Sequence, residues 1–207
     1  MKKERHKIHK IGLTGGIAAG KSFAAEILRR EGIAVIDMDA LGKEITDESP
    51  TIIREISKIV GKNVADGGRL DRQGVREAIF ADARIKRDLE NLLHPMIRRE
   101  FEDRCDELEE EGKRLVVCEA ALLVESGHYK TLEGLIVVTA PLQMRKERLI
   151  KRDGISEKLA NQMIEAQISD EERLAHATYH VRNDGDTTHL YEQIKTIVDS
   201  WREADWL

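Results

Sequence analysis

The stretch Gly15-Gly16-Ile17-Ala18-Ala19-Gly20-Lys21-Ser22 decides the fold of this chain. It has the pattern G-x-x-x-x-G-K-[ST], in which glycines let the backbone approach a ligand closely and consecutive N–H groups can point inward. The lysine of this pattern reaches phosphate oxygens, and its final hydroxyl is a ligand for Mg2+. The stretch, called here the phosphate cradle, therefore predicts a binding site for the phosphates of ATP or GTP.

The sequence on either side of the phosphate cradle supports this prediction. Residues 8–14 form a short apolar run that looks extended, and residues 23–30 have a helical pattern that ends at Gly32. Strand, loop and helix thus follow in the required order, so the positive end of the helix faces the anion. The alternative is a glycine-rich turn that matches the pattern by accident.

Length and composition restrict the class of protein. A chain of 207 residues with 41% hydrophobic residues suits one large domain or a core with insertions. A net charge of -5 and only 4% aromatic residues argue against a nucleic-acid partner. No apolar run approaches a membrane span or a signal sequence, and Cys105 and Cys118 lack metal-ligand spacing. We expect a cytoplasmic protein without a membrane partner, and the sequence leaves the oligomeric state open.

Strand-like and helical patterns alternate along the chain. The strands are expected at 8–14, 33–37, 115–118, 135–139 and 179–181. Helices are expected at 50–60, 71–80, 82–110, across much of 141–175, and up to about residue 201, whereas no strand is expected between 40 and 112. Pro95 either opens a new helix or kinks a longer one.

This alternation predicts an α/β fold with a three-layer P-loop NTPase core and a mostly parallel five-stranded sheet. Two helical insertions interrupt it, and the second is expected to act as a lid. The predicted parts of this single domain are a core (1–39, 113–140 and 176–207), a first helical insertion (40–112) and a helical lid (141–175).

Two aspartates follow the strand predicted at 33–37. Open α/β sheets bind ligands at the carboxyl ends of their strands, and alternate residues of an extended segment point the same way. Asp37 and Asp39 can therefore converge or divide roles, and one could accept the proton of a substrate hydroxyl. The alternative is that Asp39 only caps a helix that starts at Ala40.

Arginines recur at helical spacing in the predicted lid, and they are Arg145, Arg148 and Arg152. They fall within about 60° of one another around a helix, and the guanidinium fork binds phosphate oxygens bidentately. Arg173 is a candidate for a fourth cation that binds phosphate oxygens. The alternative is a solvated face with ion pairs to Glu147 or Asp153.

Seven ordered motifs give the chain a resemblance to the dephospho-coenzyme A kinases over nearly its whole length. The matching segments are 11–22, Val35-Ile36-Asp37-Met38-Asp39, Leu70-Asp71-Arg72 with Ile79-Phe80, Leu93-His94-Pro95 with Ile97, Leu122-Leu123-Val124-Glu125, Arg148-x-x-x-Arg152-Asp153 with Gln167, and Asn183-Asp184-Gly185. The resemblance implies transfer of phosphate from ATP to the ribose 3'-hydroxyl of dephospho-coenzyme A, which gives coenzyme A and ADP.

The resemblance also assigns residues to roles. It implies that Asp39, Lys21 and Arg152 are catalytic and that Ser22 binds the Mg2+ cofactor. It also implies that the insertion 40–112 is a helical substrate-binding insertion, with the acceptor bound at Asp39, Arg72 and His94. The residues expected to bind ATP are Gly15, Gly16, Ile17, Ala18, Ala19, Gly20, Lys21, Ser22, Phe23, Arg148, Arg152, Asn183 and Gly185.

Some positions depart from the family pattern. Phe23 stands where the family usually has threonine, Ala121 replaces a usual proline, and Arg182 is unusual before the Asn183 loop. Glu119 is a candidate for the carboxylate that positions Mg2+, or it is only a surface carboxylate. Two other functions stay open, namely another P-loop small-molecule or nucleotide kinase and a nucleotide-dependent switch, although the chain lacks the guanine-reading Asn-Lys-x-Asp segment.

Overall fold

The structure is a computed structural model that describes residues 7–207, except for the side chain of Glu48. The chain divides into two compact units. The first comprises residues 7–36 and Asp106–Leu207 of the described chain, and we call it the nucleotide unit because it contains the phosphate cradle. The second, Asp37–Cys105, is called the helical unit. Each unit is described by itself.

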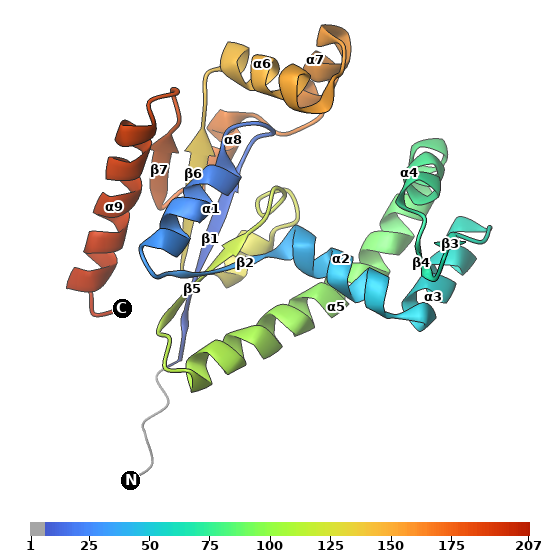
Figure 1. The fold of residues 1–207 in the computed structure, drawn as a ribbon, viewed down its shortest axis with the longest axis horizontal. Coiled ribbons are helices and arrows are strands. Elements are labelled where there is room, and N and C mark those ends of the chain that lie inside the picture. The colour runs from blue at the N-terminus through green and yellow to red at the C-terminus, as the bar shows by residue number, and fades with distance from the viewer. Residues whose placement is uncertain (1–6) are drawn as a thin grey trace. The chain divides into compact units, whose positions relative to one another are not determined.

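A five-stranded sheet forms the centre of the nucleotide unit (Figure 1). Its spatial order is β2 (Ala34–Asp37), β5 (Leu115–Glu119), β1 (His9–Gly15), β6 (Gly134–Thr139) and β7 (Tyr179–Arg182). The strand β1 pairs in parallel with β5 and β6, and β6 pairs in parallel with β7. The predicted mostly parallel five-stranded sheet is therefore confirmed, with the strand that leads into the phosphate cradle at its centre.

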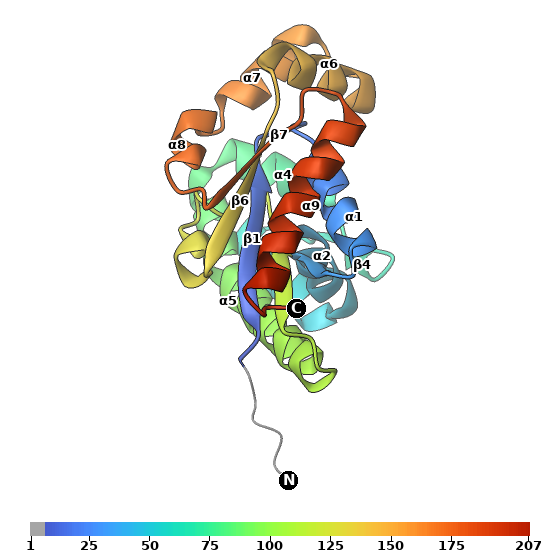
Figure 2. The ribbon, with the colours of Figure 1, turned by 90° about the vertical axis from the view of Figure 1, so that its left-hand side faces the viewer.

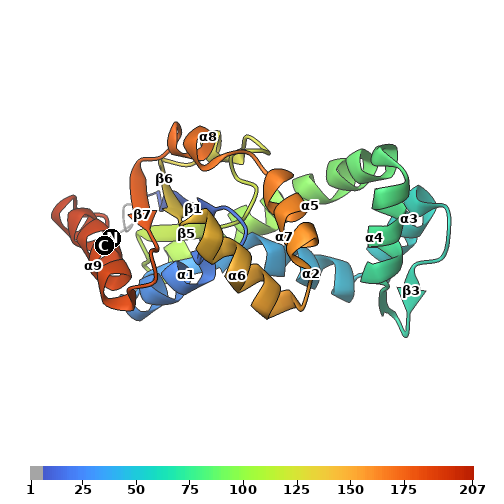
Figure 3. The ribbon, with the colours of Figure 1, turned by 90° about the horizontal axis from the view of Figure 1, so that it is seen from above.

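Helices cover both faces of this sheet, as two perpendicular views show (Figures 2 and 3). Helices α1 (Lys21–Arg30) and α9 (Thr187–Glu203) contact each other on one face, whereas α8 (Asp170–Leu174) lies on the other. The remaining helices are α6 (Leu142–Asp153), α7 (Glu157–Glu165) and the short 3-10 helix η1 (His128–Thr131). This arrangement has the three layers expected from the sequence.

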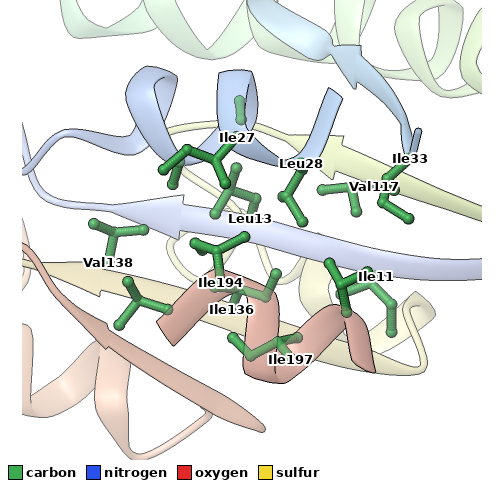
Figure 4. Packing of buried hydrophobic residues seen from close by; sticks show 14 of the residues in the cluster. Ile11, Leu13, Ile27, Leu28, Ile33, Val117, Ile136, Val138, Ile194 and Ile197 are labelled. Carbon is green, nitrogen blue, oxygen red and sulfur yellow. The ribbon is translucent and has the colours of Figure 1, made fainter. Parts of the chain in front are cut away.

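The core between the sheet and helices α1 and α9 is apolar (Figure 4). Ile11 and Leu13 alternate along β1, so both point to the same face, where they pack with Ile27 of α1 and Ile194 of α9. The strands β1, β5 and β6 are buried along most of their length, as expected for a parallel sheet with helices on both faces. This packing fixes the end of β1, where the phosphate cradle begins.

The helical unit contains α2 (Met38–Glu48), α3 (Pro50–Val60), α4 (Arg72–Ala81) and most of α5 (Ala83–Glu110). Ile56, Val64 and Leu89 form its buried centre, with partly buried apolar side chains around them. The side chain of Ser49 caps α3, and Pro50 occupies the first helical position, where a missing N–H costs nothing.

One expectation for this unit is wrong, and one of the two alternatives for Pro95 is excluded. A short antiparallel hairpin, β3 (Ala65–Asp66) and β4 (Arg69–Leu70), occurs where no strand was expected, because strands of two residues produce no alternating pattern. Pro95 does not open a new helix, because it lies inside the continuous helix α5.

None of the helices that the structure describes combines the length and apolar content needed to cross a membrane.

Candidate active site

The phosphate cradle is a tight loop between the central strand and α1. Gly15 ends β1, and α1 begins at Lys21, with Gly20 in the left-handed conformation (φ 99°) as its N-cap. A Cβ atom on Gly20 would also overlap the side-chain amide of Asn183. Glycine is therefore required at position 20 both by the backbone conformation and by packing.

Backbone donors are available where the helix begins. The N–H groups of Gly20, Lys21 and Ser22 donate to no acceptor among residues 7–207, whereas the N–H of Phe23 already bonds to the carbonyl of Gly20. Unsatisfied N–H groups at a helix N-terminus, together with the helix dipole, form an anion site. This geometry suits the phosphates expected from the sequence.

Lys21 lies beside a buried carboxylate. Its Nζ atom is 2.8 Å from Oε1 of Glu119, which ends β5 next to β1 and is only 2% exposed. Arg29 approaches the other oxygen of Glu119 at 3.6 Å. The hypothesis that Glu119 is a surface carboxylate is wrong. The buried negative charge holds Lys21 at the cradle, where its ammonium group can bind phosphate oxygens.

The residues near the start of α1 fit a magnesium ion that binds together with phosphates. The hydroxyl of Ser22 is exposed there, and Glu119 supplies a carboxylate at the end of the neighbouring strand. Among the described residues, no group of three or more His, Cys, Asp or Glu side chains could hold a metal ion by itself. Mg2+ commonly takes one or two protein ligands and substrate oxygens, so this donor set is sufficient.

The arginines of the predicted lid have different environments. Arg145 is buried and bonds to Asp170 at 3.2 Å, and burial lowers the pKa of its guanidinium. Arg148 donates from Nη2 to Oδ1 of Asn183 at 3.2 Å. Arg152 is exposed and pairs with Asp153 at 2.6 Å, as the alternative interpretation expected, and this hydrogen bond raises the pKa of Arg152. The structure therefore does not gather the three side chains on one phosphate-binding face.

Asn183 contacts the phosphate cradle directly. Its Nδ2 atom donates to the carbonyl of Ala19 at 2.8 Å, while its Oδ1 atom accepts from Arg148. Gly185 has a left-handed φ of 104° in the same loop. Phe23 is partly buried against the core of the nucleotide unit. Its ring therefore packs against apolar side chains at the position where the family pattern has a threonine.

At the start of the helical unit, Asp37 and Asp39 have different environments. The side chain of Asp37 accepts hydrogen bonds from the N–H groups of Asp39 and Ala40, at 2.9 and 3.0 Å, and so it caps α2. The hypothesis that Asp39 is the cap is wrong, because the helix begins at Met38. Asp39 lies exposed in the first helical turn.

A cavity of about 630 Å³ lies within the helical unit. Asp39, Arg72 and His94, the three predicted acceptor residues, all line it. The other polar residues of its lining are Lys43, Thr46, Arg76, Lys86 and Glu90. Four Lys and Arg side chains against two carboxylates favour an anionic ligand, and apolar side chains such as Leu93 and Ile97 form much of the rest. We call it the acceptor cavity.

Arg72 is held in place by residues that the sequence did not indicate. Its Nη2 atom donates to Oγ1 of the buried Thr46 at 3.1 Å and to Oδ1 of Asp47 at 2.9 Å. Thr46 and Asp47 belong to α2, whereas Arg72 begins α4. No local pattern could have identified this pairing, because it depends on how the two helices pack.

Comparisons with known proteins identify one family. A family model described as dephospho-CoA kinase matches residues 9–189. A dephospho-CoA kinase of Corynebacterium glutamicum is 33% identical over 91% of this chain and 97% of its own length. Among solved structures, a dephospho-CoA kinase from Campylobacter jejuni matches with a TM-score of 0.72 and 28% identity, over 95% of this chain and 98% of that one.

The protein TT1252 from Thermus thermophilus has the same fold, with a TM-score of 0.81 and 33% identity, over 93% of this chain and 97% of that one. The match of the family model to most of the chain, at this level of identity to relatives of the same name, shows the family. This chain belongs to the dephospho-CoA kinase family.

Proposed function

We propose that this chain catalyses the ATP-dependent phosphorylation of the ribose 3'-hydroxyl of dephospho-coenzyme A, which gives coenzyme A and ADP. The observation that carries the proposal is the acceptor cavity, in which a carboxylate and several cations line one space of about 630 Å³. Dephospho-coenzyme A combines a hydroxyl acceptor with negatively charged phosphates, so this lining suits it. The family membership supports the same substrate.

The donor ATP binds at the phosphate cradle. The unsatisfied N–H groups of Gly20, Lys21 and Ser22 bind its phosphate oxygens, and the ammonium of Lys21 stabilises their charge. Ser22 holds Mg2+, which neutralises negative charge on the donor phosphates when it is bound. Asn183 stabilises the loop because it donates to the carbonyl of Ala19, and Arg148 in turn donates to Asn183.

Asp39 acts on the acceptor hydroxyl. The hydroxyl oxygen attacks the γ-phosphorus, the bond from that phosphorus to the β–γ bridging oxygen breaks, and ADP leaves. The proton of the hydroxyl passes to the carboxylate of Asp39, which lies exposed at the edge of the acceptor cavity lining. Asp37 cannot share this role as freely, because its side chain caps α2.

Two arginines and one histidine complete the proposed site. Arg72 and His94 bind the acceptor in the cavity, and Arg152 stabilises charge on the transferring phosphoryl group. In this division of labour the insertion 40–112 binds the acceptor, the segment 141–175 is the lid, and the rest of the chain is the core.

We also propose a cytoplasmic location. Cys105 and Cys118 are buried and carry no disulfide, which suits a reducing compartment.

Incubation with Mg-ATP and one acceptor at a time tests the proposed function. The acceptors are dephospho-coenzyme A, adenylate and shikimate, and the readout is ADP release together with mass analysis of the acceptor. Phosphorylation of dephospho-coenzyme A alone is the expected result. Preferred phosphorylation of another acceptor would mean a different small-molecule kinase, and no transfer to any of them would favour a nucleotide-dependent switch.

A further inference from the structure

Two side chains hold the main chain of Ile17, in the middle of the phosphate cradle. The N–H of Ile17 donates to Oε1 of Gln167 at 2.7 Å. The carbonyl of the same residue accepts from Nε of Arg145 at 3.0 Å. Both polar main-chain groups of one cradle residue are thus bound by side chains that lie more than a hundred positions away in the sequence.

Arg145 is itself fixed by a row of alternating charges, in which the two arginines are buried and the two carboxylates are partly accessible. Its Nη1 atom donates to both carboxylate oxygens of Asp170, at 3.3 and 3.2 Å. Asp170 also accepts from the fully buried Arg173 at 3.2 Å, and Arg173 donates to Glu125 at 2.9 Å. Two cations alternate with two carboxylates, so the charges balance, and the guanidinium of Arg145 has little freedom to turn.

The shape of the cradle matches this arginine. A Cβ atom on Gly16 would overlap the guanidinium group of Arg145, so any larger residue at position 16 would force the arginine to move from its place against the loop. A row of partly buried charges without a ligand role is ordinarily a weak source of stability. Here its end atom, Nε of Arg145, is directed at the backbone of the loop, which a purely structural row would not require.

The cradle needs such support because of its backbone conformation. Ala18, with a φ of 59°, and Gly20, with a φ of 99°, both lie in the left-handed region on the C-terminal side of Ile17. Non-glycine residues adopt this region at a cost and persist there only when the surroundings hold them. A loop that is already held in its binding conformation loses less entropy when the ligand arrives.

We propose that Arg145 and Gln167 are positioning residues of the phosphate cradle. Together they fix the peptide groups of Ile17, and this keeps the N–H groups of Gly20, Lys21 and Ser22 directed at the donor phosphates. They act through the loop and touch no phosphate themselves. The proposal rests on the proposed function only in that the cradle binds the nucleotide donor.

The test uses Gln167→Met, which keeps the side-chain length, and Arg145→Met, which keeps an unbranched side chain up to the position of Nε, and both variants lack the bonding atoms. The dissociation constant of Mg-ADP is measured by calorimetry, and that of dephospho-coenzyme A is measured separately. Each variant is expected to weaken ADP binding about tenfold, since a hydrogen bond to the loop is lost, while affinity for dephospho-coenzyme A stays the same. Arg145→Lys, which keeps the charge, is expected to recover part of the loss.

The double variant gives the sharper result. Both side chains hold the same residue, so once one is removed the loop is already released and loss of the other costs less. We expect the combined loss of ADP affinity to be clearly smaller than the product of the two single losses. Losses that multiply, or ADP affinity that is unchanged in the folded single variants, would overturn the proposal.

Two controls separate positioning from simple destabilisation. Ile194→Val removes one methyl group from the core, and Lys146→Gln removes a cation of α6 that pairs with Glu157 at 3.0 Å. Both should leave the ADP affinity unchanged. If Arg145→Met fails to fold, Gln167→Met carries the test, because Gln167 is outside the row of alternating charges. Faster hydrogen exchange of the Ile17 amide is then the expected second readout.

The outcomes distinguish this proposal from the proposed function. If the wild-type protein binds Mg-ADP but transfers no phosphate to dephospho-coenzyme A, the proposed function fails and the positioning test still applies. If it transfers phosphate normally but the two variants keep wild-type ADP affinity, only the positioning proposal fails.

Discussion

The phosphate cradle and the acceptor cavity are built in opposite ways. In the cradle, side chains from distant positions bond to the backbone of a tight loop, at Ile17 and at Ala19, and leave specific donors open. The acceptor cavity is an open space of about 630 Å³ in which several cations line the wall. From this difference we infer that phosphate binding depends on a backbone held in one conformation. Selection of the acceptor depends instead on the charge and shape of a large cavity.

The largest effect is expected from Asp39→Asn, which tests the chemical role of the cavity. A general base contributes about 10²–10⁴-fold to the rate, so kcat should fall by this order while the affinity for ATP stays nearly the same. The measurement is steady-state turnover together with equilibrium ATP binding. Turnover close to that of the wild type would show that Asp39 does not accept the proton.

The next effect concerns the cradle. Lys21→Met removes a charge that acts on the donor phosphates, and we expect kcat to fall about 10²–10³-fold. The variant also leaves the buried carboxylate of Glu119 without its closer partner, which lowers the free energy of unfolding. In the Lys21→Met/Glu119→Gln double variant, the stability should recover but the turnover should not. Recovery of both would mean that Lys21 serves only to neutralise Glu119.

A smaller change is expected from Arg72→Lys in the acceptor cavity. Lysine keeps the charge but cannot bond as a fork to Thr46 and Asp47 while it also binds the acceptor. KM for dephospho-coenzyme A should rise about tenfold and KM for ATP should not change. Arg69→Lys, an exposed position in β4 outside the cavity lining, is the matched control. An equal rise in both KM values would contradict the separation of the two regions.

The smallest effect is expected at the contact between α9 and the C-terminal end of α1, the helix that follows the cradle. The hydroxyl of Tyr191 in α9 donates to Glu31, the C-cap of α1, at 2.6 Å, and Arg202 bonds to the same carboxylate at 3.1 Å. The hydrogen bond from Tyr191 is the main cause that lowers the pKa of Glu31, and it raises the pKa of Tyr191. Tyr191→Phe should therefore lower the free energy of unfolding slightly at neutral pH.

The pH dependence of this difference follows from the two directions. A lowered carboxyl pKa gives stability that is complete above the ordinary value of 4.5 and is lost as the pH falls through the lowered value. A raised phenol pKa gives stability that is complete below the ordinary value of 10.0 and is lost as the pH rises through the raised value. Denaturant unfolding of the wild type and of Tyr191→Phe should therefore show a difference in the free energy of unfolding between these two pH limits. In strong acid the two proteins should unfold with the same free energy. A difference that persists in strong acid would point to packing instead.

The cradle could be predicted from the sequence because all its parts are local. Strand, glycine loop, Lys21 and helix α1 all occur within residues 9–30, and each residue type meets a physical requirement of a bound phosphate. The strands of the sheet were predictable for a similar reason, since apolar runs such as the one in β6 are buried on both faces.

The supports of the cradle could not be predicted in this way. Helical periodicity places Arg145 and Arg152 on nearly the same side of α6, but the structure buries the first against Asp170 and leaves the second in solvent. Periodicity gives a direction around a helix, whereas burial depends on what the neighbouring elements offer. The choice of Asp37 over Asp39 as the cap of α2 depended on where the helix begins, which sequence patterns fix only to within about two residues.

The position of the transferred phosphate tests the central claim most directly. The wild-type protein is incubated with Mg-ATP labelled in the γ-phosphate and with dephospho-coenzyme A, and the site of the label in the product is assigned by phosphorus NMR and by digestion with a 3'-specific phosphatase. The account predicts that all transferred label is on the ribose 3'-oxygen and that one ADP forms for each coenzyme A. Label at another oxygen, or ADP release without labelled coenzyme A, would contradict it.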